Sequence, residues 1–372
     1  MSKGQSFKII HIVGARPNFM KAGPVIRALG FQDRIHQMLV HTGQHYDLNM
    51  SEIFFQQLNI PEPDINLEVG SGTQAVQTAE IMLRLEKVLV EERPDLVIVY
   101  GDVNSTLAGA LVCAKLLIPF AHVEAGLRSF DRTMPEEINR VITDQLAQLH
   151  FIHSPEAEPN LLKEGVLREK IYYVGNVMID TLVNLLPLAK DRYENLSARY
   201  NINANKYALV TLHRPSNVDN GSSLKAIMDA LNEISKWVKV IFPVHPRTRK
   251  NLEKNGIKQE GENFYLVDPL GYLDFLALQC CAGLVITDSG GIQEETTYLN
   301  IPCLTIRENT ERPITITMGT NVLVGQDMEL LKKSVLEILS GDWKQAQVIP
   351  LWDGKSAQRI AEIIIKYLFH SA

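Results

Sequence analysis

Short apolar runs alternate with longer amphipathic segments along the first half of the chain. The apolar runs are nearly continuous, as expected for parallel strands that are covered on both faces. They cover residues 7–13, 36–42, 95–101, 120–125, 150–154 and 171–175. The amphipathic segments at 20–29, 75–92 and 106–116 are typical of helices. This strand–helix alternation predicts βαβ units and a doubly wound parallel sheet.

A second series of apolar runs follows a helical, then polar connector over residues 178–206. Its members are residues 207–213, 239–245, 264–269, 283–288 and 302–307. The pattern predicts an α/β protein of two Rossmann-like, doubly wound parallel-sheet domains, 1–177 and 178–354, that face a central cleft. The amphipathic tail at 355–372 is expected to form a helix that packs back on the first domain.

Polar residues follow most of these predicted strands, in both halves of the chain. In open parallel sheets, ligands bind outside the carboxyl ends of the strands. The residues at these ends are Arg16, Gln44, His45, Asp102, Glu124, His213, His245, Arg247, Asp288 and Ser289. This placement predicts one ligand site to which both domains contribute.

Composition narrows the class of ligand. The 372 residues are 45% hydrophobic and 22% charged, which is ordinary for a soluble enzyme, and the net charge is −6. A negative chain is not expected to have nucleic acid or an anionic membrane as its main partner. The four cysteines show no C-x-x-C or zinc spacing. With no signal peptide and no apolar stretch of membrane-spanning length, a cytoplasmic protein without a metal is expected.

The strongest local motif is the Asp-Ser-Gly-Gly turn at 288–291, between a predicted strand and a predicted helix. The first N–H groups of a helix lack internal partners and carry positive partial charge, and glycines let an anion approach them closely. The turn therefore fits a diphosphate, with a purely structural turn as the alternative. Of the two glutamates that follow, one is expected to accept hydrogen bonds from a ribose diol and the other to be a solvated helix carboxylate.

Cationic side chains also lie near the predicted strand ends. Arg16 and Lys21 follow the first strand, His245 and Arg247 follow a strand of the second domain, and Arg312 follows another. Such a set would neutralise a diphosphate without a metal ion. Solvated surface cations are the alternative interpretation.

Carboxylates and a histidine supply the candidate chemistry. Asp102 and Glu124 follow neighbouring strands, and Glu136 begins a helix in which Arg140 lies four residues later, on the same face. Neighbouring buried carboxylates are suited to acid–base catalysis, whereas an exposed ion pair would be merely structural. His213 adds a second-domain histidine that is either catalytic or structural.

Nine motifs together resemble the non-hydrolysing UDP-N-acetylglucosamine 2-epimerases over nearly the full chain. They are GARPNFMK, TGQH, GDVNSTLAGA, HVEAGLRS, PEEINR, VGNVMIDTL, TLHR, TDSGGIQEE and TERP, in this order. The resemblance implies a glycosyltransferase-B type fold, a homodimer, and a UDP-sugar as the substrate. It also implies a reaction that needs no cofactor.

The resemblance implies a role for each matching position. The catalytic carboxylates would be Asp102, Glu124 and Glu136, with Arg140 supporting them and His213 placed near the diphosphate. The substrate-binding residues would be Arg16, Lys21, His245, Arg247, Phe275, Ser289, Gly290, Gly291, Glu295 and Arg312. Glu294 would have no role beyond its helix.

The implied reaction converts UDP-GlcNAc to UDP-ManNAc and supplies surface polysaccharide precursors. UDP would leave C1 to give a 2-acetamidoglucal and would then re-add after a proton returns to C2. A UDP-diacetamido-uronic acid is the alternative substrate. The residues alone are also compatible with a UDP-sugar glycosyltransferase, a hydrolysing epimerase or a non-catalytic sensor.

The chain departs from the family pattern at three places. HRPSN at 213–217 replaces the common His-Arg-Arg-Glu-Asn, and Tyr46 and Asp47 replace residues that contribute to an allosteric UDP-GlcNAc site in regulated members. Leu270 stands where some members have a glutamine near uracil. An allosteric site is therefore an open question for this sequence.

Overall fold

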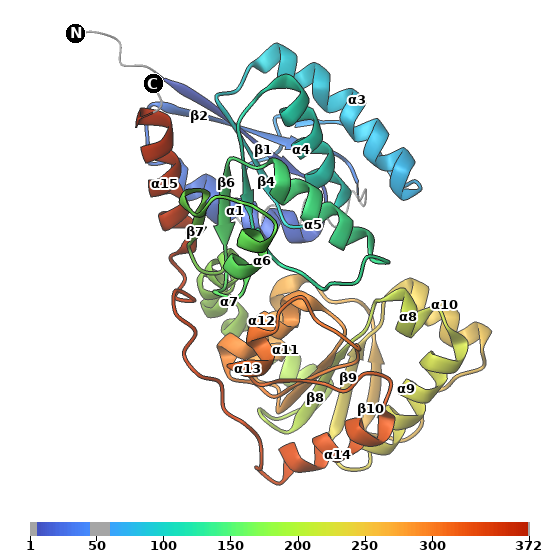
Figure 1. Cartoon of the computed structure of the whole chain (residues 1–372). Coiled ribbons are helices and arrows are strands. Elements are labelled where there is room, and N and C mark those ends of the chain that lie inside the picture. Colours follow the sequence, from blue (N-terminus) through green and yellow to red (C-terminus); the bar gives the residue numbers. More distant parts are fainter. Residues whose placement is uncertain (1–5, 45–59, 371–372) are drawn as a thin grey trace. The chain divides into compact units, whose positions relative to one another are not determined.

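The computed structural model describes residues 6–44 and 60–370 of the chain. These residues form two compact units (Figure 1). The first unit contains the chain up to Thr181 and the segment from Pro350 onward, and the second runs from Leu182 to Ile349. Each unit is built on one parallel β-sheet, so the predicted fold class of two doubly wound α/β domains is confirmed.

Within the described residues, the sheet of the first unit has seven parallel strands in the order β3-β2-β1-β4-β5-β6-β7. The strands are β1 (Phe7–Val13), β2 (Ile35–His41), β3 (Ile65–Asn66), β4 (Leu96–Tyr100), β5 (Phe120–Val123), β6 (Leu149–Ile152) and β7 (Ile171–Tyr173). The central strand β4 is buried at every position because helices cover both faces of the sheet. From β1 to β3 the successive strands are added toward one edge of the sheet, and from β4 to β7 they are added toward the other edge. The direction of winding therefore reverses between the adjacent strands β1 and β4.

The helices of the first unit form two layers, one on each face of its sheet (Figure 1). They are α1 (Arg16–Leu29), α3 (Gln74–Glu92), α4 (Asn104–Leu116), α5 (Pro135–Leu146), α6 (Ala157–Lys163) and α15 (Ser356–His370). The helix α1 packs beside α15, and α4 packs between α3 and α5. A short 3₁₀ turn, Arg168–Lys170, precedes β7.

The C-terminal helix α15 belongs to the first unit although the second unit precedes it in the chain. Asp180 caps its start by accepting hydrogen bonds from the backbone N–H groups of Ser356 and Ala357. The indole of Trp352, just before the helix, donates to the His153 carbonyl at 2.9 Å. These contacts fix the returning segment to the end of β6 and to the first turn of α7 (Val177–Tyr200).

The second unit has a six-stranded parallel sheet, within the described residues, in the order β10-β9-β8-β11-β12-β13. Its strands are β8 (Tyr207–Thr211), β9 (Lys239–Pro243), β10 (Phe264–Val267), β11 (Leu284–Thr287), β12 (Cys303–Thr305) and β13 (Asn321–Leu323). The winding reverses between β8 and β11, as it does between β1 and β4 in the first unit.

Helices also cover the sheet of the second unit. They are α8 (Pro215–Val218), α9 (Gly221–Ile234), α10 (Pro246–Lys254), α11 (Tyr272–Cys280), α12 (Gly290–Leu299), α13 (Ile314–Thr317) and α14 (Met328–Leu339). The helices α9 and α14 pack together and share an apolar core with the sheet, and α12 packs beside α11 and α13. The helix α7 (Val177–Tyr200) begins in the first unit and continues into the second.

All eleven predicted strands are present, most of them shortened at one or both ends by one to three residues. The strands β3 and β13 were not predicted, because they have only two and three residues and carry no recognisable pattern. The predicted helices at 20–29, 75–92 and 106–116 are present as α1, α3 and α4, and the predicted C-terminal helix is present as α15.

Candidate active site

The first group of candidate residues lies where the sheet of the first unit reverses its winding. At such a point the loops after two adjacent strands diverge and leave room for a ligand. Arg16 begins α1 directly after β1, and Asp102 follows β4. Asn18 holds the first loop, because its Oδ1 accepts hydrogen bonds from the N–H groups of Gly14 and Ala15 and its Nδ2 donates to the Tyr100 carbonyl.

Lys21 and Glu124 form a buried ion pair in this region. The Nζ–Oε2 distance is 2.8 Å, and the two side chains are 6% and 5% exposed. Glu124 follows β5 with a φ of +77°, a left-handed conformation that is rare outside glycine. The rare conformation marks the residue as a candidate for function. Gly101 is required beside it, because a Cβ there would lie 2.9 Å from the Lys21 ammonium.

Arg140 connects α5 to the loop after β4. Its Nε is 3.1 Å from Asp102 Oδ2, and its Nη1 is 2.5 Å from Glu137 Oε2. The sequence analysis paired Arg140 with Glu136 by spacing, but Glu137 is the glutamate whose carboxylate is buried against it. Glu136 lies partly buried in the first turn of α5, one residue before this pair.

Glu137 also fixes the loop that precedes α5. Its carboxylate accepts hydrogen bonds from the N–H groups of Ser129 and Phe130. Burial raises the pKa of Glu137, but these bonds and the Arg140 guanidinium outweigh burial and hold the pKa below its ordinary value. Glu137 therefore stays ionised and anchors both Arg140 and the loop.

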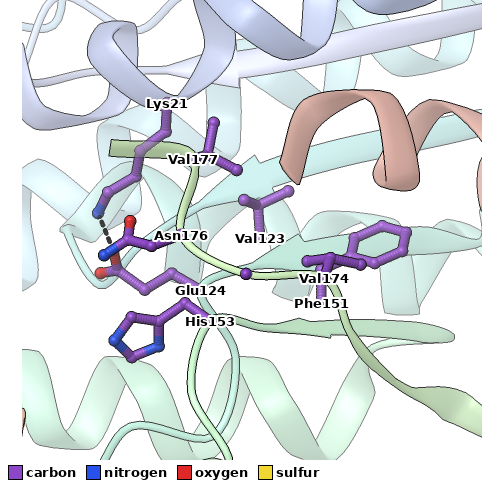
Figure 2. Close-up of a pocket in the computed structure, with 9 residues that line it drawn as sticks. Lys21, Val123, Glu124, Phe151, His153, Val174, Asn176 and Val177 are labelled. Carbon is purple, nitrogen blue, oxygen red and sulfur yellow. Dashed lines mark ion pairs between the residues drawn. The ribbon is translucent and has the colours of Figure 1, made fainter. Parts of the chain in front are cut away.

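A small pocket opens at the ends of β5, β6 and β7. Figure 2 shows Lys21, Glu124, His153 and Asn176 at one side of it, with apolar side chains at the other. Lys21 comes from α1, whereas Glu124, His153 and Asn176 follow the three strands. Neither His153 nor Asn176 was singled out from the sequence.

In the second unit, His213 and Asp288 pair at the point where the sheet reverses its winding. His213 follows β8, Asp288 follows β11, and His213 Nδ1 is 2.9 Å from Asp288 Oδ1. Burial raises the pKa of Asp288, but hydrogen bonds from His213, Arg214 and Asn217 and the charge of His213 outweigh it, so the pKa is lowered. The ionised Asp288 orients the His213 ring, which is 58% exposed, through its Nδ1.

The predicted diphosphate turn lies at the start of α12, as expected. Ser289 is the N-cap residue, and the helix begins at Gly290. A Cβ at Gly290 would lie 2.5 Å from Arg312 Nη1, so this glycine lets the guanidinium approach the helix start. The structure therefore brings together Ser289, Gly290 and Arg312; Gly291 follows in the first turn.

The structure corrects the prediction for Glu294 and leaves the role of Glu295 a prediction. Glu294 was expected to be a solvated helix residue, but it is fully buried, and its Oε1 lies 2.9 Å from Arg312 Nε. The sequence of α12 is mostly polar and does not show which face of the helix is covered. Glu295 is buried too, and the Tyr272 hydroxyl donates to its Oε1 at 2.9 Å.

The remaining predicted residues of the second unit occupy more open positions. His245 is the exposed N-cap of α10, where its Nδ1 accepts a hydrogen bond from the N–H of Arg247. The Arg247 guanidinium pairs with Asp219 and is 64% exposed. Phe275 is partly buried in α11, the helix that begins with Tyr272.

The sequence analysis missed the residues that hold the candidate groups in place. Asp288 was noted as a strand end without a role, and neither Glu137 nor Tyr272 was considered. All three are buried residues at or near the end of a helix or strand, and burial is not visible in the sequence. The predicted strand-end residue His45, and the departures at Tyr46 and Asp47, lie outside the described residues.

No group of three or more His, Cys, Asp or Glu side chains in residues 6–44 and 60–370 could hold a metal ion. No helix in that part of the chain is long and apolar enough to cross a membrane.

The chain is similar to known proteins over nearly its whole length. Residues 27–365 match a family model described as UDP-N-acetylglucosamine 2-epimerase. The UDP-N-acetylglucosamine 2-epimerase of Methanocaldococcus jannaschii is 45% identical over 366 residues, which cover 96% of this chain and 98% of that protein. The UDP-2,3-diacetamido-2,3-dideoxy-D-glucuronate 2-epimerase of Pseudomonas aeruginosa is 43% identical over 362 residues, with 96% and 99% covered.

The similarity extends to three-dimensional structure. The crystal structure of the M. jannaschii UDP-GlcNAc 2-epimerase in complex with UDP-GlcNAc and UDP matches with a TM-score of 0.88 at 45% identity. The match covers 96% of this chain and 99% of that one. Sequence and fold therefore indicate the same family.

Proposed function

Because the chain belongs to the UDP-N-acetylglucosamine 2-epimerase family, a family of isomerases, we propose that it converts UDP-GlcNAc to UDP-ManNAc. The observation that carries this proposal is the pair of carboxylates at neighbouring strand ends, each with its own cation. Asp102 lies against Arg140, and Glu124 lies against Lys21. A protein that only bound a nucleotide sugar would not need two carboxylates held in this way.

The reaction requires a carboxylate because C2–H is not next to a carbonyl group. Departure of UDP from C1 builds positive charge there, and this charge acidifies C2–H. A carboxylate then takes the proton and leaves a 2-acetamidoglucal and UDP. A proton returns to C2 from the opposite face, and UDP re-adds at C1. We assign the proton transfers to Asp102, Glu124 and Glu136, supported by Arg140.

The second unit supplies groups suited to a leaving diphosphate. The N–H groups at the start of α12 and the Arg312 guanidinium would stabilise its charge, and His213, oriented by Asp288, would add a hydrogen-bond donor. Glu295 would accept hydrogen bonds from the ribose. Arg16, Lys21, His245 and Arg247 complete the set of proposed cationic groups, and Phe275 is assigned to uracil.

A second substrate has support from one observation. The P. aeruginosa relative, named for a UDP-diacetamido-glucuronate, is nearly as similar to this chain as the M. jannaschii protein is. A UDP-diacetamido-uronic acid is therefore the alternative substrate. Either reaction would supply a precursor for surface polysaccharide in the cytoplasm.

We also propose that the protein is a homodimer. Val76, Leu83 and Val90 are each more than half exposed, and they repeat every seven residues along α3. This spacing places the three side chains on one face of the helix. A second copy of the chain is the partner that we assign to this face.

A panel of UDP-sugars in deuterated water, followed by NMR, tests the proposal. We expect interconversion of the 2-acetamido sugars at C2, with one deuterium entering C2 of the product. Turnover without deuterium at C2 contradicts the mechanism. Free N-acetylmannosamine would indicate a hydrolysing enzyme, and UDP release that needs an added acceptor would indicate a glycosyltransferase.

A further inference from the structure

His122 is a fully buried residue of β5 whose two ring nitrogens both have partners. Nδ1 lies 2.7 Å from Asp144 Oδ1, and Nε2 lies 2.8 Å from the carbonyl oxygen of Gly101. A carbonyl oxygen has no hydrogen to donate, so Nε2 must carry one. If Asp144 is ionised, it has no hydrogen either, and Nδ1 must carry a second one.

His11 in the same sheet shows the ordinary arrangement. Its Nε2 faces Gln37 Oε1, an acceptor, whereas its Nδ1 faces the Tyr100 hydroxyl, which can donate. A single ring hydrogen satisfies both contacts, so His11 is neutral. The two histidines are both fully buried and differ in the partners of Nδ1.

Asp144 is held in its ionised form by further donors. Its Oδ2 lies 2.8 Å from Arg128 Nη1 and accepts a hydrogen bond from the Gly126 N–H at 3.0 Å. Burial raises the pKa of Asp144, but the charges of His122 and Arg128 and the His122 hydrogen bond outweigh it and lower the pKa to about 2. The Arg128 and Gly126 contacts do not depend on the charge of His122, and a carboxylate that faces a buried guanidinium is ionised, so both oxygens of Asp144 act as acceptors.

We propose that His122 carries a hydrogen on both ring nitrogens, and that His122 and Asp144 together are positioning residues for the proposed catalytic carboxylates. His122 and Asp144 together hold the loop after β4 and the loop after β5. His122 fixes Gly101, which precedes Asp102, and Asp144 fixes Gly126, two residues after Glu124. The positioning role rests on the proposed function, whereas the charge of His122 does not.

The backbone of Glu124 needs such support because it is left-handed, with a φ of +77°. The positions on either side of it with positive φ are the glycines Gly101, at +64°, and Gly126, at +81°, which adopt such values readily. A left-handed residue other than glycine persists only where its surroundings fix it. The two loops are also joined directly, because the Gly101 N–H donates to the Val123 carbonyl at 2.9 Å.

The charges around the imidazolium balance. Arg128 on the loop after β5 also pairs with Glu164, at 2.6 Å, so two cations face the carboxylates of Asp144 and Glu164. His150 on β6, the strand partner of His122, is bonded through Nε2 to the Asp144 carbonyl. Loss of the His122 proton would leave the buried Asp144 with one cation fewer, which buried ion pairs do not tolerate.

Neutron diffraction from crystals of the whole protein in deuterated water tests the charge without any variant. We expect deuterons on both ring nitrogens of His122 and on only one of His11. In solution, the nitrogen-15 signals of the His122 ring should show the imidazolium form. One deuteron on the His122 ring, or a deuteron on Asp144, overturns the proposal.

Asp144→Asn tests the positioning role. The new amide can donate to His122 Nδ1, so the ring becomes neutral while Nε2 still donates to Gly101. We expect kcat to fall by about 10- to 100-fold, with KM for the UDP-sugar changed by less than about twofold. Unchanged kcat, or a rise in KM alone, refutes the role.

If Asp144→Asn does not fold, His122→Gln tests the positioning role instead. Glutamine keeps one N–H donor for Gly101 but brings no charge, and we expect the same loss of kcat. A wild-type enzyme without epimerase activity would refute the proposed function and with it the positioning role. The neutron result still decides the charge of His122 in that case.

Discussion

Lys21 of α1 and Glu124 after β5 form an ion pair that is almost completely removed from water, with 2.8 Å between Nζ and Oε2. The residues are more than a hundred positions apart in the sequence, and their meeting depends on the parallel order of β1, β4 and β5. Removing one partner of a buried pair leaves a poorly compensated charge and is far more costly than removing an exposed pair.

We therefore predict that Lys21→Met lowers the free energy of unfolding by about 3–5 kcal/mol. Urea unfolding followed by circular dichroism measures the change. The double variant Lys21→Met with Glu124→Gln should recover part of the loss, because the remaining side chain then has no charge to compensate.

Lys8 provides the matched control. It pairs with Glu92 at the same 2.8 Å distance, but the two side chains are 38% and 24% exposed. Lys8→Met should cost no more than about 1 kcal/mol. Equal costs for Lys8→Met and Lys21→Met would show that burial does not set the strength of the Lys21–Glu124 pair.

The adjacent residues Glu136 and Glu137 should separate catalysis from stability. Glu136→Gln removes a proposed acid or base and should cut kcat by about 10²–10⁴-fold with little change in unfolding. Glu137→Gln weakens the contacts to Arg140, Ser129 and Phe130 and should cost about 1–3 kcal/mol of stability. Steady-state kinetics and urea unfolding of both variants check this. Reversed effects would mean that Glu137 is the catalytic residue.

The strands were predictable because long β-branched runs alternate with amphipathic helices. The strands β3 and β13 were not, because two or three residues are too few for a pattern to stand out. Parallel topology also made the strand ends predictable as the site, which is why Asp102 and Glu124 could be named from the sequence. The residues that contact Asp102 and Glu124 could be identified only from the structure.

The partners could not be predicted because several choices satisfy the same spacing. Residues three and four positions before Arg140 both share its face of the helix, and only packing selects Glu137. Likewise, a glutamate in the first turns of a helix favours the helix dipole whether it is exposed or buried. The burial of Glu294 against Arg312 became visible only once α12 was packed against its neighbours.

Gly290→Ala should weaken the binding of UDP. The added Cβ would lie 2.5 Å from Arg312 Nη1 and 2.8 Å from Glu311 Oε1, so the guanidinium must move away from the helix start. We expect a rise in Kd of about tenfold or more, measured by isothermal titration calorimetry with UDP. Gly72→Ala is the control, since its nearest neighbour atoms are 3.7 Å away. Unchanged affinity in Gly290→Ala would argue against a diphosphate at this turn.

Leu83→Glu should convert the proposed dimer to monomers. The residue is 59% exposed in the middle of the apolar face of α3, and a buried carboxylate at a dimer interface would be strongly unfavourable. Size-exclusion chromatography with light scattering gives the mass. Leu336→Glu, on α14 of the second unit and 47% exposed, is the matched control and should leave the mass unchanged. A dimeric Leu83→Glu protein would exclude this face as the interface.

Stability should fall as the solution becomes acidic, and buried histidines supply much of the effect. Burial lowers the pKa of both His11 and His41 to about 4. Between about pH 6.5 and pH 4 the unfolded chain binds a proton at each site and the folded protein does not, so acid favours unfolding. Asp180 acts in the opposite sense, because burial raises its pKa to about 6 and the folded state takes up its proton first.

The variant His11→Gln isolates one of these contributions. Glutamine does not titrate, so the difference in unfolding free energy between variant and wild type should shrink by up to about 3 kcal/mol from pH 7 to pH 4. Urea unfolding at several pH values measures it. At neutral pH the variant loses the hydrogen bonds to Tyr100 and Gln37 and is the less stable protein. A difference that stays constant with pH would show that burial does not lower the pKa of His11 in the folded protein.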